Sequence, residues 1–253
     1  MPRTAREKSE SGIYHIMLRG INRQNLFQND YDCEKFLETI GLYQGKSGYR
    51  IYAYCLMSNH VHILLKEEQE PLATIVKRIS SSYVYYYNKK YDRCGHLFQE
   101  RFKSEVVEDE NYLLMVLRYI HQNPVEAKIV QTPEEYKWSS YREYLSGDKI
   151  INTDFVLGLF SPDRNIAVEK FISFNKERSK EKCLEHVVST RINDVEAREI
   201  IKKLANVEDI SQLQTLEKET KNEIIRKIKE VEGISIRQIA RITGLSYSLV
   251  LKV

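Results

Sequence analysis

Two histidines, His60 and His62, lie one residue apart inside the run MSNHVHILLKE. In a β-strand alternate side chains point to the same face, so the two imidazoles would lie side by side, with Val61 on the opposite face. Imidazole nitrogens at this spacing suit one divalent cation. The other interpretation is two polar residues on the exposed face of a half-buried strand.

A tyrosine and an asparagine lie four residues apart in LRYIHQNPVEAKIV, so Tyr119 and Asn123 share a face if this segment is helical. A tyrosine beside a divalent metal can attack phosphorus, although a free phenol, with a pKa of about 10, is a weak nucleophile unaided. The metal would polarise the phosphate, and the Asn123 amide oxygen would add a third ligand while leaving positions open. Alternatively, Tyr119 is a core aromatic residue and Asn123 caps the helix before Pro124.

A small set of strands and helices must position these residues. Hydrophobic periodicity predicts strands at residues 12–20, 50–57, 60–66 and 101–109, and helices at 30–43, 71–91 and 110–122. The last of these helices should end near Asn123, because a proline disfavours the helical conformation of the residue before it. We therefore expect an α+β fold with a ferredoxin-like antiparallel sheet and helices on one face.

The composition changes after about residue 147, where tyrosines become rare and Lys, Glu and Ile dominate. This predicts two domains, 1–147 and 148–253, the second entirely helical. Its last segment, GISIRQIARITGLSYSLVLKV, has the spacing of a helix-turn-helix, with Gly244 at the turn. Residues 221–253 contain seven basic and three acidic side chains, a net charge of +4. We expect Arg237 and Arg241 to contact duplex DNA; the alternative is a helical hairpin used for packing or dimerisation.

Charge and composition narrow the protein's class only partly. The net charge of +3 is too balanced to indicate a nucleic-acid partner by itself. The four cysteines show no pairing pattern or CxxC spacing, which predicts reduced thiols in a cytoplasmic protein. The N-terminal segment lacks an apolar signal core, and no apolar run approaches the length of a membrane span.

Several blocks in residues 10–145 give the chain a resemblance to the single-tyrosine HUH transposases, most of all to the REP-associated tyrosine transposases. The blocks are YHIMLRGINRQNLFQND, YAYCLMSNHVHILL, GHLFQERFKSEVVEDENYLL, LRYIHQNPVEAKIV and KWSSYREYL. The resemblance implies that His60 and His62 bind a divalent metal, Mg²⁺ or Mn²⁺, that Tyr119 is the nucleophile and that Asn123 completes the metal site. It also implies a homodimer that recognises hairpins in single-stranded DNA, forms a 5′-phosphotyrosine and frees a 3′-hydroxyl.

Four cations in the matched blocks are expected either to hold DNA phosphates or to be solvated surface charges. They are Arg19, Arg23, Arg101 and Lys103. His15 and His96 have no partner at a metal spacing and are not expected to be ligands. His121 would point away from Tyr119 on a helix and is expected to support the site or the core. The segment VEAKIV is less basic than the resemblance leads us to expect after Asn-Pro.

Other classes of protein share parts of this pattern. A metallohydrolase with HxH on a strand would need further histidines and carboxylates converging on the metal, and no such set is evident. A replication initiator or plasmid relaxase would use the same strand-cleaving chemistry. A non-enzymatic alternative is a domesticated DNA-binding regulator that reads DNA with its helix-turn-helix and uses the first domain as a dimer scaffold.

Overall fold

The computed structural model describes residues 6–99, 101–147, 149–177, 183, 194–231 and 233–253. The chain divides into two compact units, residues 1–184 and 185–253. The strands of the first unit are β1 (Ile13–Arg19), β2 (Arg50–Met57), β3 (His60–Lys66) and β4 (Lys103–Val106). Its helices are α1 (Asp30–Ser47), α2 (Leu72–Lys90), α3 (Glu110–Glu126), α4 (Glu143–Ser146), α5 (Thr153–Phe160) and α6 (Arg164–Lys176), with 3-10 turns at Ile21–Arg23, Pro133–Glu135 and Ser140–Arg142.

The four strands form one antiparallel sheet in the order β2-β3-β1-β4. Together with the predicted element order, this is the ferredoxin-like arrangement expected from the sequence. His62 lies opposite Met17 on β1 and Cys55 on β2, and His60 lies opposite Arg19. Directly paired residues share a face of the sheet, so both histidines lie on the face that carries Met17 and Arg19.

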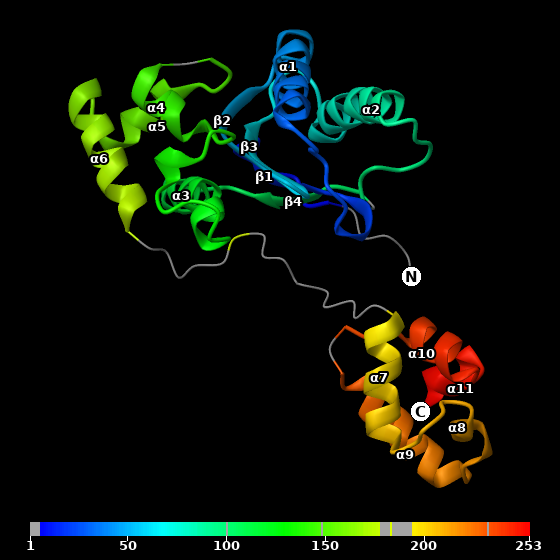
Figure 1. Ribbon diagram of the computed structural model, residues 1–253. Helices are drawn as coiled ribbons and strands as arrows, with labels where there is room; N and C mark the ends of the chain where they lie inside the picture. Colours follow the sequence, from blue (N-terminus) through cyan, green and yellow to red (C-terminus); the bar gives the residue numbers. More distant parts are fainter. Residues whose placement is uncertain (1–5, 100, 148, 178–182, 184–193, 232) are drawn as a thin grey trace. The chain divides into compact units, whose positions relative to one another are not determined.

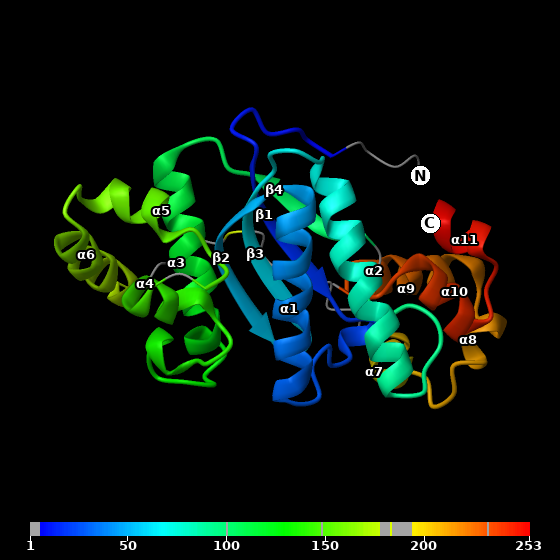
Figure 2. The ribbon, with the colours of Figure 1, turned by 90° about the horizontal axis from the view of Figure 1, so that it is seen from above.

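Helices cover both faces of the sheet, whereas we predicted one. Figure 1 shows α1 and α2 on one face and α3 on the other, and Figure 2 shows α1 and α2 from above. Phe36 of α1 and Tyr83 of α2 pack edge to face, with ring centroids 5.0 Å apart, in the first of these layers. The second layer exists because α3 also has a buried side, including Leu117 and Ile120. The histidine face is therefore enclosed by a helix.

The first helix is longer than predicted. An Asn29–Asp32 capping box starts α1, with Asn29 accepting from the Asp32 amide and Asp32 accepting from the Asn29 amide. The helix passes through Gly45 and ends only at Gly48, whose φ of +57° is the left-handed conformation that glycine adopts without strain. A glycine permits a helix end but does not impose one, so α1 continues through Gly45 beyond the predicted end at residue 43.

The third helix also runs past its predicted end. We expected it to stop near Asn123, but α3 continues to Glu126 with Pro124 inside it. The main-chain oxygens of Asn123 and Pro124 accept from the amides of Ala127 and Ile129, which satisfies the final turn. A proline removes one amide donor and disfavours helix before it, but packing can outweigh that cost.

The predicted domain boundary at residue 147 is wrong, because α5 and α6 belong to the first unit. Phe171 of α6 is fully buried and stacks on Tyr144 of α4, with centroids 4.4 Å apart and an interplanar angle of 20°. The aromatic side chain of Tyr144, just before the predicted boundary, is therefore itself covered by a later helix. The change in composition after residue 147 therefore falls inside the first unit and does not mark a domain boundary.

The second unit is helical in its described residues, as predicted. Its helices are α7 (Asp194–Ala205), α8 (Gln212–Thr215), α9 (Lys218–Lys229), α10 (Ile236–Thr243) and α11 (Tyr247–Lys252). Ile201, Ile225, Ile239 and Val250 are buried in its core. Gly244 joins α10 to α11 at a φ of +69°, and a β-carbon there would clash with the Gln214 side chain. In the described parts of both units, no helix is long and apolar enough to span a membrane.

Candidate active site

His60 is held between two asparagines. Its Nδ1 is 2.7 Å from Asn59 Oδ1, and its Nε2 is 3.3 Å from Asn123 Oδ1. A neutral imidazole has one N–H, and the shorter contact, from Nδ1 to Asn59 Oδ1, is the one assigned to it; Nε2 then turns its lone pair toward Asn123 Oδ1. The His60 nitrogen and the Asn123 oxygen then both point a lone pair into the space between them. A cation placed there would be coordinated by both atoms.

His62 is fully buried beside His60, with ring centroids 5.1 Å apart. Its Nδ1 is 3.0 Å from His15 Nε2, so the bond between the two rings fixes the orientation of His62. His15 Nδ1 in turn lies 3.9 Å from Glu105 Oε2 on β4. Burial, opposed by Glu105, lowers the pKa of His15, which keeps its ring neutral.

Sequence reasoning missed the part played by His15. The strand register places His15 opposite Leu64 and Met17 opposite His62, so His15 and His62 lie diagonally on one face. A second imidazole or carboxylate that orients a ligand histidine is a common feature of metal sites. The sequence signal was that His15 and Met17 are two residues apart on β1 and so share a face of the strand. This points to His62 only once the register of β1 on β3 is known.

Tyr119 lies against the two buried histidines. Its ring is nearly perpendicular to that of His62, with centroids 5.4 Å apart, and lies 5.8 Å from that of His15. The residue is 9% exposed, so Tyr119 packs largely as a core aromatic. Asn123 is one helical turn further along α3 and does not cap it, because the helix continues to Glu126.

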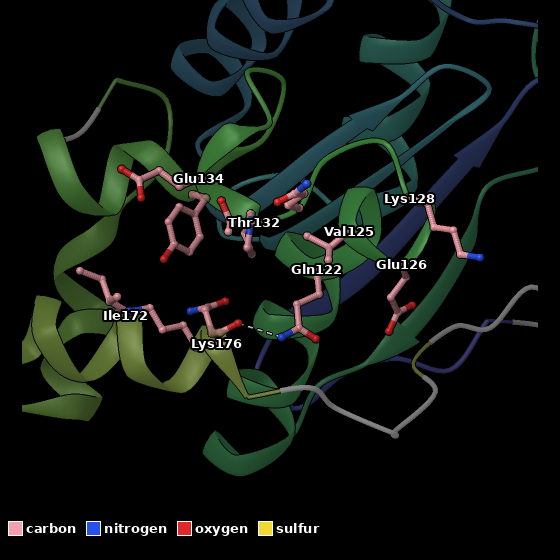
Figure 3. A pocket seen from close by; sticks show the side chains of 12 residues that line it. Gln122, Val125, Glu126, Lys128, Thr132, Glu134, Ile172 and Lys176 are labelled. Atoms are coloured by element: carbon pink, nitrogen blue, oxygen red, sulfur yellow. Dashed lines mark hydrogen bonds between the residues drawn. The ribbon is translucent and has the colours of Figure 1, made fainter.

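Both ends of α3 are anchored, which fixes Tyr119 and Asn123 together. At the start, the Asp109 side chain accepts from the Tyr112 amide at 2.8 Å. Near the end, Gln122 Nε2 donates to the main-chain oxygens of Asn175 and Glu177, at 2.8 and 2.7 Å. Figure 3 shows the first of these bonds inside a cavity of about 580 Å³ between α3, α6 and the loop that follows α3. None of the sequence-predicted site residues lines that cavity.

Two predicted phosphate-binding residues lie at the His60 end of the sheet. Arg19 is opposite His60 in the register, and Arg23 follows in the adjoining turn. Burial and then the charge of Arg23 lower the pKa of Arg19, as expected for two cations held close together. Asn22 and Arg23 have φ values of 50° and 60°, in the left-handed region of the backbone. Residues with a β-carbon rarely adopt this conformation, and it is often found at functional turns.

The other two predicted cations are placed differently from each other. Lys103 is exposed and pairs with Met17, so it lies in the same cross-strand row as His62, two strands away. Arg101 instead lines a groove with Leu18, whose side chain is on the opposite face of the sheet from Met17. The structure thus brings Arg19, Arg23 and Lys103 toward the histidine face and does not bring Arg101 there.

The remaining histidines are not part of the cluster. His121 is fully buried and its Nε2 is 2.9 Å from Ser140 Oγ, on the side of α3 that packs on Tyr141 and Phe171. Burial lowers the pKa of His121 to about 3, so the ring is a neutral core residue. In the residues that the structure describes, no three His, Cys, Asp or Glu side chains are arranged to hold a metal. A cation at this site would therefore depend on two imidazoles and an amide.

The predicted DNA contacts of the second unit both lie on α10. Arg237 is exposed, whereas Arg241 Nη2 forms an ion pair with Asp194 Oδ1 of α7 at 2.6 Å. In a helix-turn-helix the second helix reads the groove, and here that helix would be α11. Its exposed side chains include Tyr247 and Lys252.

Comparisons with known proteins bear on the first unit. Residues 8–123 match the family model described as IS200-like transposase. A solved REP-associated tyrosine transposase bound to a REP hairpin is similar to the chain, with a TM-score of 0.50 and 13% identity, over 61% of this chain and 96% of that one. A proposed transposase from Deinococcus radiodurans R1 has a TM-score of 0.34 and 16% identity, over 50% of this chain and 98% of that one. A search of curated proteins finds no match.

Proposed function

Because residues 8–123 belong to the IS200-like transposase family, we propose that the chain is a metal-dependent enzyme that cleaves and rejoins single-stranded DNA through a 5′-phosphotyrosine. The observation that carries this proposal is the convergence of four side chains from two elements. His60 and His62 of β3 meet Tyr119 and Asn123 of α3 on one face of the sheet. These are the chemical types that phosphodiester transfer at a metal site requires.

Each side chain has a separate role in the proposed reaction. Tyr119 Oη attacks the scissile phosphorus, and the bond from phosphorus to the 3′ oxygen breaks. The phenolic proton passes through water to the leaving 3′ oxygen, which becomes a free hydroxyl. Attack of a 3′-hydroxyl on the phosphotyrosine reverses these steps and joins strands. The packing of Tyr119 against His62 holds the phenol in place before the substrate arrives.

The residues present fit a divalent metal. The Nε2 atom of His60 and the Oδ1 atom of Asn123 face each other, and His15 holds His62 from behind through Nδ1. When bound, Mg²⁺ or Mn²⁺ would polarise the scissile phosphate and offset the charge that develops on it. Asn59 and His15 hold the two ligand imidazoles in the orientation that this task needs.

The proposed substrate is single-stranded DNA that contains a hairpin, and the proposed assembly is a homodimer. The solved relative bound to a REP hairpin supports the first expectation. Arg19 and Arg23 beside His60, with Lys103 on the same face, supply cations for the phosphates nearest the scissile bond.

Incubating the protein with 5′- and 3′-labelled hairpin oligonucleotides and Mg²⁺ or Mn²⁺ tests the proposal. We expect a covalent protein–DNA band that carries the label 3′ to the cut, and a released fragment with a free 3′-hydroxyl. Excess chelator or His60→Ala should abolish the band. Cleavage at an unchanged rate in excess chelator would exclude the metal role, and cleavage without a covalent band would exclude the tyrosine.

A second candidate function is that of a DNA-binding regulator without catalysis. The observation that favours it is the pair α10 and α11 around Gly244, with exposed polar and cationic side chains on α11. As a helix-turn-helix, this pair would bind duplex DNA. Absence of any covalent band from a folded protein that binds a specific duplex would favour this function over the first.

A further inference from the structure

A groove of about 320 Å³ lies between α2 and the loop that leads into β4, on the opposite face of β1 from His62. Its floor is apolar and includes Val76 and Leu18, and two half-buried rings, Phe98 and Phe102, line the loop side. This volume lies within the range of sites that hold small organic groups. The groove belongs entirely to the first unit and contains none of the four candidate catalytic side chains.

Three cations surround these rings: Arg6, Lys77 and Arg101. The Arg6 guanidinium carbon stacks 3.6 Å from the centre of the Phe102 ring, and Arg6 Nη2 donates to the Phe102 main-chain oxygen at 2.8 Å. No Asp or Glu is among the described residues that line the groove. Burial and then the charge of Arg101 lower the pKa of Arg6, so like charges are held together there. A negatively charged ligand would relieve that repulsion.

The groove is close to the candidate active site along the sheet edge. Loop residues 97–99 run beside the end of β1: Leu97 O accepts from the Ile21 amide, and the Gln99 amide donates to Arg19 O. Arg19 lies opposite His60 in the sheet. A strand of nucleic acid that leaves the His60 end can therefore pass over this loop.

We infer that the groove holds one unpaired nucleotide of the single-stranded DNA substrate, outside the catalytic centre. The base lies against Phe98 and the apolar side of α2, and its flanking phosphates contact Arg101, Lys77 and the outer edge of Arg6. An aromatic wall flanked by cations is the arrangement with which proteins bind single strands without pairing. This inference rests on the proposed function for the identity of the polymer, and it names where an unpaired base is bound.

Binding of a labelled hairpin with an unpaired tail, measured in EDTA so that no cleavage is needed, tests the inference. Each tail position is replaced in turn by an abasic site. We expect one position at which the loss of the base weakens wild-type binding about tenfold. In Phe98→Leu that position should lose its effect, since the ring is gone while the main-chain pairing of Phe98 with Gly20 remains. Arg101→Ala should lower the slope of log affinity against log salt by about one.

Lys46→Ala is the matched control. Lys46 is an exposed cation in the last turn of α1, which leads into the start of β2 beside Lys66 and thus lies at the opposite end of the sheet from Arg19. We expect it to keep the abasic penalty and the salt slope of the wild type. A uniform response of the wild type to all abasic positions, or an unchanged penalty in Phe98→Leu, would overturn the inference.

The two proposals fail in different ways. If the covalent adduct forms but no abasic position weakens binding, the nucleotide-binding groove is rejected and the proposed enzyme activity is supported. If Phe98→Leu removes the abasic penalty but no adduct forms, the proposed strand cleavage is rejected and the nucleotide-binding groove is supported. A folded chain that binds none of these oligonucleotides rejects both.

Discussion

At the residue scale, the candidate site is a set of rings held in place by hydrogen bonds. His60 and His62 each present one nitrogen because the other is occupied by Asn59 or His15. Neutral imidazole is the form that binds metals, and burial of His15 and His62 favours it.

The first prediction concerns the nucleophile. Tyr119→Phe removes one oxygen and keeps the ring against His62, so we expect loss of the covalent adduct with little change in DNA affinity. Tyr112→Phe is the control, because Tyr112 is on the same helix but hydrogen-bonds Glu105. It should still form the adduct. Mass spectrometry of the digested adduct locates the modified residue; DNA attached to Tyr112 would show that the nucleophile is misassigned.

The second prediction concerns His15. His15→Ala removes the bond that orients His62, so we expect Mn²⁺ affinity to fall about 10- to 100-fold while the fold is kept. Calorimetric titration with Mn²⁺ measures this without any turnover. His15→Gln, which can still reach His62 Nδ1, should recover part of the affinity. Equal Mn²⁺ affinity in the wild type and both variants would mean that His15 only fills space.

At the element scale, a buried carboxylate joins α1 to α2. Asp32 is fully buried and accepts from Lys90 Nζ at 2.6 Å and from the hydroxyls of Tyr86 and Tyr91 at 2.9 and 2.6 Å. Burial alone would raise the pKa of Asp32, but these hydrogen bonds and that of the Gln28 amide outweigh it, and the pKa is lowered. The link fixes the two-helix layer behind β3.

The third prediction follows from this link. Asp32→Asn should destabilise the first unit by about 2 kcal/mol at neutral pH, because charge-assisted hydrogen bonds are lost. A carboxyl whose pKa is lowered on folding stabilises the protein above its unfolded pKa, about 3.9, and this contribution disappears as pH falls below that value. Urea unfolding followed by the fluorescence of Trp138, the one tryptophan in the chain, reports on this unit. A difference between wild type and variant that does not shrink in acid would contradict the assignment.

The strands and helices were easier to predict from the sequence than their ends or the contacts between residues far apart in the chain. Short, largely apolar runs were enough to predict β2 and β3 with their observed bounds. The end of α3 was not predictable, because the cost of Pro124 is local whereas the packing that outweighs it comes from elsewhere in the fold. The His15–His62 bond joins residues 47 positions apart, and only the register of β1 on β3 reveals it.

At the scale of the whole molecule, the two units have separate cores. Ile239, Ile242 and Val250 of α10 and α11 are part of the second core. Removing residues 231–253 alone would therefore strip that core as well as any DNA contact. A test of the second unit must remove it entirely.

The fourth prediction is made on that basis. A chain ending at residue 184 should still form the covalent adduct on a short hairpin oligonucleotide, since Tyr119, His60 and their supports all precede that point. It should lose affinity for duplex DNA, together with the salt dependence that phosphate contacts cause. Titration of both proteins with duplex and hairpin DNA across a salt series measures this. Identical duplex affinity would assign the second unit a role other than DNA binding.

The single turn of α3 between Tyr119 and Asn123 restricts how such a chain can change its length. One residue inserted or deleted between them would rotate one group by about 100° around the helix axis relative to the other. The phenol and the amide would then no longer face the same histidines. Substitutions at the three intervening positions do not change the angle between Tyr119 and Asn123 around the helix axis. In any chain built on this site, the spacing of these two residues should therefore stay fixed, whatever happens to the lengths of its loops.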